Sequence, residues 1–226
     1  MARSVIVTGG FGILGRAVAS AFSAAGDNVT RIDFGAEASN TRDSGLDIGG
    51  VDLTNKVATR SAVDQVISAF GGIDVLVNVA GGFLWETLED GSIESWAKMQ
   101  SMNLMTAATI TQLSLPALKN SPGGRVINIG AGAAIKSGMG MGAYAASKSG
   151  VHRLTESLAE ELAGSNITVN AVLPSIIDTP TNRADMPDAD TSQWVKPEAI
   201  ADVIIFLASD AARSVTGALV PVTHGG

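Results

Sequence analysis

A tyrosine and a lysine stand four residues apart, at Tyr144 and Lys148, in a segment with helical periodicity. That spacing places both side chains on one face of a helix. A nearby ammonium stabilises a phenolate, so we expect it to lower the pKa of Tyr144 below the free value of about 10. A tyrosine of that kind can donate or accept a proton during a reaction. A surface tyrosine beside a solvated lysine has the same spacing, so the pair needs support from elsewhere in the chain.

That support comes from a glycine-rich turn at residues 8–15, with the sequence TGGFGILG, which follows the first apolar run. Glycines let the turn tighten and let the backbone approach a pyrophosphate, whose charge lies at the positive end of a helix. A glycine-rich turn without a ligand is the alternative, but its position between the first strand and the first helix favours a dinucleotide. With the tyrosine and lysine, the turn indicates nucleotide-dependent redox chemistry. The expected contacts are Gly9, Phe11, Gly12, Ile13 and Leu14.

An aspartate at the end of the expected second strand bears on the choice of dinucleotide. Asp33 follows Gly15 by eighteen residues. There its carboxylate can accept a hydrogen bond from the ribose 2'-hydroxyl and repel a 2'-phosphate, which favours NAD over NADP. Two alternatives stay open, because a solvated aspartate would have the same sequence, and Arg31 and Arg42 could bind a phosphate instead.

Three further positions are candidates for the same site. Asp52 and Leu53 could bind the adenine amino group through a carboxylate and a backbone amide, although an ordinary turn aspartate looks the same. Residues 78–82 end the fourth expected strand with small residues that let the backbone pass close to a ribose, and a plain loop is the alternative. Asn103 could hold a water in a proton relay to Lys148, unless it is an exposed helix asparagine.

The elements that must position these residues follow from the pattern of the chain. Short β-branched runs alternate with longer helical segments, which is typical of βαβ units and a parallel sheet. We predict an α/β fold: one Rossmann domain over residues 1–226, with a doubly wound parallel sheet of about seven strands flanked by helices. The expected strands are 4–8, 28–33, a short strand ending near Asp52, 74–78, 125–129, 168–173 and 218–222. The expected helices are 15–25, 55–70, 93–118, 144–163 and 198–208.

The segment 175–194 is the one long stretch in which we expect no regular structure. Loops of that length are uncommon inside compact domains and often serve a function. We therefore interpret it as a mobile lid that covers the substrate.

Composition excludes several classes of protein. The chain has 226 residues, 46% of them hydrophobic, no cysteine and a net charge of -7. One compact domain fits this length. Without cysteines, and with His152 and His224 far apart, we expect no metal site. The negative net charge disfavours nucleic acid as a partner. No apolar run is long enough to span a membrane, and residues 1–3 lead directly into the first expected strand, which leaves no room for a signal peptide. We expect a cytoplasmic protein that acts on a small molecule.

Together these motifs resemble the short-chain dehydrogenase/reductase family over nearly the full chain. The resemblance rests on the turn at 8–15, Asn78-Val79-Ala80-Gly81, Asn103, Tyr144-x-x-x-Lys148, and the runs 170–174 and 178–180. It implies that Tyr144 donates the proton, that Lys148 binds the nicotinamide ribose and lowers the pKa of the phenol, and that Asn103 supports the relay. It also places Pro174, Ile177 and Thr179 near the nicotinamide, and it implies a homodimer or homotetramer.

Two departures from the family pattern stand out. The turn reads T-G-x-x-G-x-x-G, whereas T-G-x-x-x-G-x-G is usual in the single-domain branch. Thirteen residues before Tyr144, where the family usually has a serine that bonds the substrate carbonyl, this chain has Ala131. Loss of one such donor costs about 10²- to 10³-fold in rate elsewhere. Ser137 is a candidate substitute, with an ordinary turn serine as the alternative.

Within the family, the chain is most similar to the dihydropteridine reductases. The likeness lies in the glycine turn, Ala80-Gly81-Gly82-Phe83, the alanine at position 131, and residues 173–194. A quinonoid dihydropterin is electron-poor and conjugated, so it fits a site without the serine. We expect the substrate to contact Phe83, Trp85, Ala131 and Trp194, although aromatic residues near a site more often serve packing.

Three hypotheses follow. The first is an NADH-dependent reductase of a planar conjugated acceptor, similar to dihydropteridine reductase. The second is a carbonyl reductase or alcohol dehydrogenase of the same family, which the run at 216–222 favours. The third is a nucleotide-binding regulator without catalysis. Self-association through the helices at 93–118 and 144–163 is expected in each case.

Overall fold

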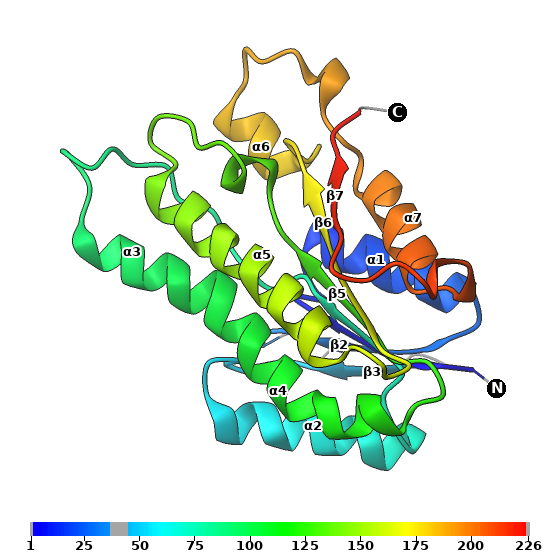
Figure 1. Ribbon diagram of the computed structural model, residues 1–226. Coiled ribbons are helices and arrows are strands. Elements are labelled where there is room, and N and C mark those ends of the chain that lie inside the picture. Colours follow the sequence, from blue (N-terminus) through cyan, green and yellow to red (C-terminus); the bar gives the residue numbers. More distant parts are fainter. Residues whose placement is uncertain (1, 37–44, 225–226) are drawn as a thin grey trace.

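The chain folds around one seven-stranded sheet in the computed structural model, which describes residues 2–36 and 45–224 (Figure 1). The strand order is β3-β2-β1-β4-β5-β6-β7, and all six pairings are parallel. The predicted doubly wound sheet is therefore confirmed. Its strands are β1 (Ser4–Thr8), β2 (Asn28–Ile32), β3 (Gly45–Ile48), β4 (Val75–Asn78), β5 (Arg125–Ile129), β6 (Thr168–Pro174) and β7 (Leu219–Val222).

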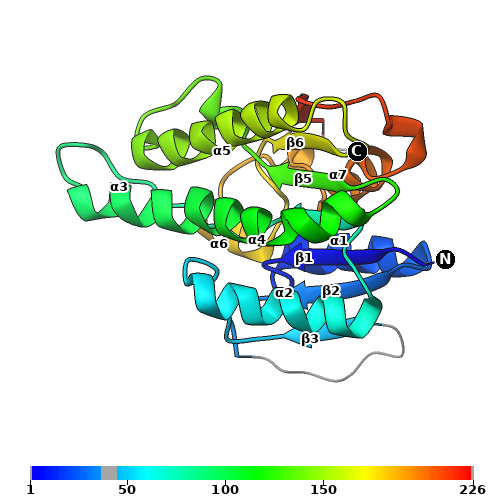
Figure 2. The same ribbon diagram turned by 60° about the horizontal axis from the view of Figure 1, so that its bottom comes forward.

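Helices cover both faces of the sheet (Figures 1 and 2). One face carries α2, α4 and α5, and the other carries α1 and α7. The α-helices are α1 (Ile13–Ala24), α2 (Lys56–Phe70), α3 (Ile93–Met99), α4 (Thr106–Asn120), α5 (Gly142–Glu161), α6 (Pro180–Asp185) and α7 (Pro197–Leu207).

Two hydrophobic cores, one on each face of the sheet, explain why the sequences of the strands are almost continuously apolar. Side chains alternate between the faces of a strand, so Val5 and Val7 of β1 pack with Phe22 of α1, while Ile6 packs on the opposite face with Val63 of α2. Each of these five side chains is fully buried. A strand with both faces covered has no polar face to alternate with the apolar one.

The order in which successive strands join the sheet reverses at β1, which lies between β2 and β4. In an open parallel sheet, this reversal leaves a crevice outside the carboxyl ends of the two neighbouring strands. The fold therefore places the loops after β1 and β4 on either side of one opening.

Three elements differ from the predicted ones. The third strand ends at Ile48, earlier than Asp52. The single helix predicted at 93–118 is interrupted by a π-helical turn, η1 (Gln100–Met105), between α3 and α4. The segment 175–194 is not irregular throughout, since it contains α6, in which Thr179 caps the N-terminus and Pro180 occupies the first turn.

No helix within residues 2–36 and 45–224 is long and apolar enough to cross a membrane. The same ranges contain no group of three or more histidine, cysteine, aspartate or glutamate side chains that could hold a metal ion.

Candidate active site

A cavity of about 990 Å³ opens at the carboxyl ends of the strands. Residues from both sides of the switch point between β1 and β4 line it. They come from the loops after β1, β2 and β4, from α5 and from the start of α6. Most of the residues predicted to bind a cofactor therefore meet in one place. Those that line the cavity are Gly9, Phe11, Gly12, Ile13, Leu14, Asp33, Asp52, Leu53, Ala80, Gly81, Tyr144, Lys148, Ile177 and Thr179.

The glycine turn forms a cradle that only glycine can build. Gly9 has φ +60°, and a Cβ there would lie 2.9 Å from the backbone of Ala80. A Cβ on Gly15 would overlap the carbonyl oxygen of Gly9. The cradle ends at α1, which begins after Gly12 without a side-chain cap. The backbone N–H groups of the first turn of α1 are thus available to an anion.

Asp33 lies beside this cradle with both carboxylate oxygens engaged by backbone. Oδ2 accepts a hydrogen bond from the Phe11 amide and Oδ1 one from the Gly35 amide, each at 2.9 Å. Arg31, the nearest predicted phosphate ligand, is buried and turned elsewhere. Its Nε donates to Asp47 Oδ1 at 2.7 Å, and the guanidinium lies 5.2 Å from the centre of the Phe11 ring. The other predicted ligand, Arg42, lies outside the described residues.

Asp52 and Leu53 line the cavity from the loop after β3. The Thr54 hydroxyl and amide donate to Asp52 Oδ1 and hold the pKa of this carboxyl below its usual value. Asn78 does not line the cavity. Its Nδ2 donates to Asn128 Oδ1 of β5 at 2.8 Å and to Thr111 Oγ1 of α4 at 3.0 Å, between the sheet and this helix.

Tyr144 and Lys148 line the cavity together from the first two turns of α5. The Tyr144 ring packs edge to face on Phe83, with 4.9 Å between ring centres. Lys148 is buried, and its Nζ donates to the carbonyl oxygen of Ile129, the last residue of β5, at 2.8 Å. The helix spacing thus brings the phenol and the amine to one site, as predicted.

The expected effect of Lys148 on the phenol is wrong for this structure. Burial raises the pKa of Tyr144 to about 12, when the prediction was a value below about 10. Burial also lowers the pKa of Lys148 to about 8. Both shifts have one cause, because a low-dielectric surrounding disfavours the charged form of either group. The amine donates to a backbone carbonyl, and the raised pKa of the phenol is due to its own burial.

Asn103 lies behind the cavity wall in η1. Its side-chain amide pairs with the backbone of Gly82 in both directions, since Oδ1 accepts from the Gly82 amide at 2.8 Å and Nδ2 donates to the Gly82 carbonyl at 3.1 Å. Nδ2 also donates to Ser147 Oγ at 2.9 Å. Asn103 is buried and not an exposed helix residue, and its predicted part in a proton relay stays a prediction.

Position 131 carries a methyl group at the end of β5. Ala131 is buried, and its amide donates to His152 Nε2 at 3.3 Å, two turns after Tyr144 on α5. Burial, with Arg153 as a smaller cause, lowers the pKa of His152, which suits a neutral acceptor. Ser137, the candidate substitute donor, is exposed outside the cavity lining and donates to the Gly138 carbonyl.

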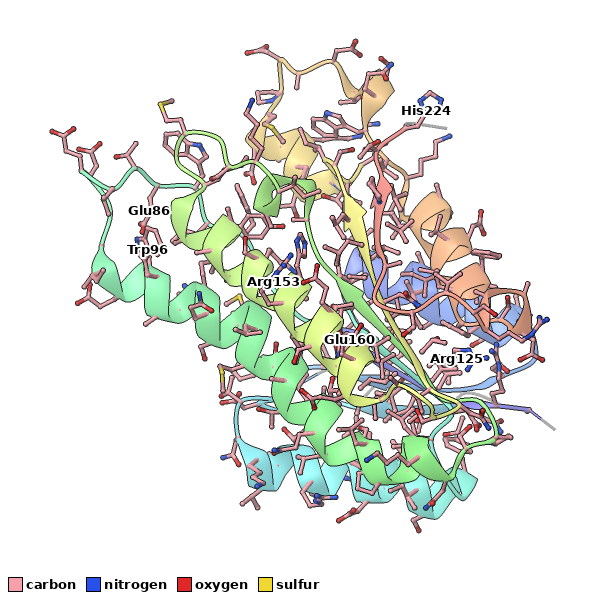
Figure 3. The ribbon with its side chains drawn as sticks, in the orientation of Figure 1. Glu86, Trp96, Arg125, Arg153, Glu160 and His224 are labelled. Atoms are coloured by element: carbon pink, nitrogen blue, oxygen red, sulfur yellow. The ribbon has the colours of Figure 1, made fainter. Side chains whose placement is uncertain are left out.

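Of the four predicted substrate contacts, Phe83 lines the cavity, whereas Trp85, Ala131 and Trp194 do not. Trp85 packs over Gly140, where a Cβ would overlap the indole, and the Glu86 amide donates to the Gly140 carbonyl at 2.9 Å. Figure 3 shows Glu86 near Trp96 of α3 at this outer end of the molecule. Trp194 is buried, away from the cavity lining.

The C-terminal wall of the cavity comes from the loop after β6 and from α6. Ile177 and Thr179 line it, whereas Pro174 does not, and the nicotinamide contacts of these three residues stay a prediction. Thr181 and Asn182 line it as well and were missed by the sequence analysis. The cap at Thr179 and the proline at position 180 would have indicated this helix start.

Comparisons with known proteins agree on one family. The family model described as short chain dehydrogenase matches residues 3–190. A 3-oxoacyl-[acyl-carrier-protein] reductase from Thermotoga maritima is 35% identical over 77% of this chain and 74% of its own length. A D-beta-hydroxybutyrate dehydrogenase from Rhizobium meliloti is 29% identical over 100% of this chain and 98% of its own.

A solved structure gives the same result for the fold. The aldohexose dehydrogenase of Thermoplasma acidophilum, in its ligand-free form, superposes with a TM-score of 0.88 at 28% identity. The match covers 98% of this chain and 92% of that one. None of these similar proteins is named as a dihydropteridine reductase.

Proposed function

Because the chain belongs to the short-chain dehydrogenase family of NAD(P)-dependent oxidoreductases, we propose that it transfers a hydride between NAD and a small planar, conjugated substrate. One observation carries this proposal. The glycine cradle, Asp33, Tyr144 and Lys148 line a single cavity. A dinucleotide site and a proton-transfer group thus face the same space.

The described residues fit a nicotinamide dinucleotide. The cradle at Gly9 and Gly15 and the uncapped start of α1 suit a pyrophosphate. Asp33 suits a ribose 2'-hydroxyl, and the ion pair between Arg31 and Asp47 withholds a cation from a 2'-phosphate, so we favour NAD. The chemistry supplied by a bound nicotinamide is the gain or loss of a hydride.

Tyr144 is the group we assign to proton transfer. Its phenol is protonated at neutral pH, because burial raises its pKa to about 12. A protonated phenol is ready to donate a proton to a substrate that is being reduced. Lys148 holds its amine in the same cavity and is fixed by Ile129. Asn103 supports the wall by holding Gly82.

The methyl group of Ala131 guides the choice of substrate. It offers no hydroxyl to a ketone oxygen at the position where the family usually has a serine, and Ser137 does not replace it. An electron-poor conjugated ring accepts a hydride without a hydrogen bond to one ketone oxygen. Phe83 adds a flat apolar surface to the same cavity, next to the Tyr144 ring.

A second candidate is a carbonyl reductase or alcohol dehydrogenase. The activities for which the relatives are named favour it, since they include a 3-oxoacyl reductase and a hydroxybutyrate dehydrogenase. In that case a donor other than a side chain at position 131 holds the carbonyl.

A panel of acceptors and donors tests the two candidates. Oxidised pterins, quinones, ketones and secondary alcohols are each offered with NADH or NADPH, or with the oxidised forms, and nicotinamide absorbance is followed. We expect the highest kcat/KM for pterins or quinones with NADH. Ketones ahead of both would favour the second candidate.

The Ala131→Ser variant sharpens the panel. If the substrate is a conjugated ring, the added hydroxyl leaves its turnover unchanged. If the substrate is a ketone, the restored donor raises kcat, by up to about 10²- to 10³-fold. A rise for ketones above the wild-type rate for pterins would contradict the first candidate.

The segment 175–194 is part of the proposal as a cover for the substrate. Its support is that Thr181 and Asn182 of α6 line the cavity together with Ile177 and Thr179. Cytoplasmic location and self-association stay predictions.

A further inference from the structure

A closed ring of contacts links the two aromatic side chains at the cavity. Ser147 Oγ donates to the carbonyl oxygen of Tyr144 at 2.7 Å and accepts from Asn103 Nδ2 at 2.9 Å. Asn103 in turn pairs with both backbone groups of Gly82. The next residue, Phe83, packs on the ring of Tyr144 and closes the ring of contacts.

We propose that Ser147 is a positioning residue, which sets the Tyr144 phenol relative to the wall that carries Phe83. The proposal rests on the function proposed above, because it assigns Tyr144 to proton transfer. Ser147 itself lines no part of the cavity and touches no reacting group. It acts through the Tyr144 backbone on one side and through Asn103 on the other.

Burial makes this linkage stiff. Ser147 is 0% exposed and Asn103 is 1% exposed, so no water competes for their hydrogen bonds. Each polar group of the network has a hydrogen-bond partner. The Ser147 hydroxyl donates once and accepts once, and both Asn103 Nδ2 and Oδ1 are bonded. A buried network with every member satisfied holds one arrangement.

The π-helical turn gives Asn103 its place in this network. An insertion of this kind shifts the register of the helix around it, and π turns are frequent at functional sites. η1 covers residues 100–105, and both of its neighbours, α3 and α4, are regular. The turn lets one side chain meet the loop after β4 and a residue of α5 at the same time.

The same helix contains a matched control. Thr155 is also 0% exposed, its Oγ1 donates to the carbonyl of Val151 at 2.8 Å, and it accepts from Asn128 Nδ2 at 2.8 Å. It therefore has the same hydrogen-bonding pattern as Ser147. It lies about 12 Å further along α5 and does not belong to the ring of contacts.

The experiment compares Ser147→Ala with Thr155→Val, each of which removes one buried hydroxyl. Tyr144 is the only tyrosine in the chain, so incorporation of fluorotyrosine gives one fluorine resonance that reports on its ring without any turnover. The resonance, the pH profile of kcat, and the KM for NADH are measured for both variants with the best acceptor of the panel, and denaturation midpoints are compared.

For Ser147→Ala we expect a shifted fluorine resonance, a displaced pH profile and a loss of kcat of roughly 10- to 100-fold, with little change in the KM for NADH. For Thr155→Val we expect a similar loss of the denaturation midpoint, but the resonance, pH profile and kcat of the wild type. Equal changes in both variants, or a wild-type resonance in Ser147→Ala, would overturn the proposal. Should the wild type reduce no acceptor, the proposed function fails, and the two resonances still decide the role of Ser147.

Discussion

The two halves of the cavity are built by different means. The dinucleotide half consists of backbone and surface groups near the ends of single strands: the glycine cradle, Asp33 and Asp52. The substrate half consists of side chains from distant segments, with Tyr144 and Lys148 from α5 meeting Phe83 from the loop after β4. The first half can be interpreted from local sequence. The second depends on how the helices pack.

The largest expected effect concerns the substrate half. Tyr144→Phe removes only the hydroxyl and should lower kcat by about 10²- to 10⁴-fold, the usual contribution of a positioned acid or base. The affinity for NADH, measured by nicotinamide fluorescence, should stay close to that of the wild type, because the cradle is untouched. Full turnover by this variant would contradict the assignment of proton transfer to Tyr144.

A substitution in the glycine cradle should disrupt the dinucleotide half. Gly15→Ala puts a Cβ against the carbonyl oxygen of Gly9, whereas Gly12→Ala puts one at 3.4 Å from that atom. We expect Gly15→Ala to lose NADH binding or to destabilise the fold by about 3 kcal/mol or more, since the clash is with backbone. Gly12→Ala is the control and should bind NADH. Calorimetric titration and urea unfolding measure both effects, and equal behaviour of the two variants would refute the cradle.

The dependence of the free energy of unfolding on pH also distinguishes the two halves, because only the substrate half contains the buried amine of Lys148. The pKa of Lys148 is about 8 in the folded protein and 10.5 as its ordinary value. Between these pH values the unfolded chain holds a proton that the folded protein has released, so the free energy of unfolding rises with pH, by roughly 3 kcal/mol in total. Tyr144 acts in the opposite sense, and its contribution is lost between pH 10 and about 12.

Lys148→Met should remove the rise. Urea unfolding at a series of pH values from 7 to 10.5 measures it, and the range stops before the loss due to Tyr144 is large. The control is Lys136→Met, which changes an exposed lysine outside the cavity. A rise that persists in Lys148→Met would show that burial of this amine is not its cause.

The smallest effect is expected at the dinucleotide end. Asp33→Asn should weaken NADH binding by about 10- to 100-fold, in line with roughly 1.5–3 kcal/mol for a hydrogen bond to a charged group. The gain for NADPH should be modest, because Arg31 keeps its partner Asp47. Binding constants for both cofactors measure this. Asp64→Asn on α2, outside the cavity lining, is the control.

The sequence predicted the parts that depend on local chemistry. The glycine turn, the strand that ends at Asp33 and the helical spacing of Tyr144 and Lys148 all reflect constraints within a few residues. The sheet followed from the alternation of strands and helices.

The missed features depend on contacts between distant segments. Arg31 pairs with Asp47 across neighbouring strands, His152 accepts from the amide of Ala131, and η1 forms where Asn103 meets Gly82. The pKa of Tyr144 was wrong for the same reason, since the spacing of two residues gives their proximity but not their burial. Only the packed structure supplies the dielectric surroundings.

The hydrogen bond from the Glu86 amide to the Gly140 carbonyl bears on how a substrate enters the cavity. It joins the loop after β4 to the loop before α5, and the indole of Trp85 lies across the joint. We therefore expect these two loops to move together. Any widening that admits a bulky molecule is then expected from α6, which lines the cavity with Thr181 and Asn182.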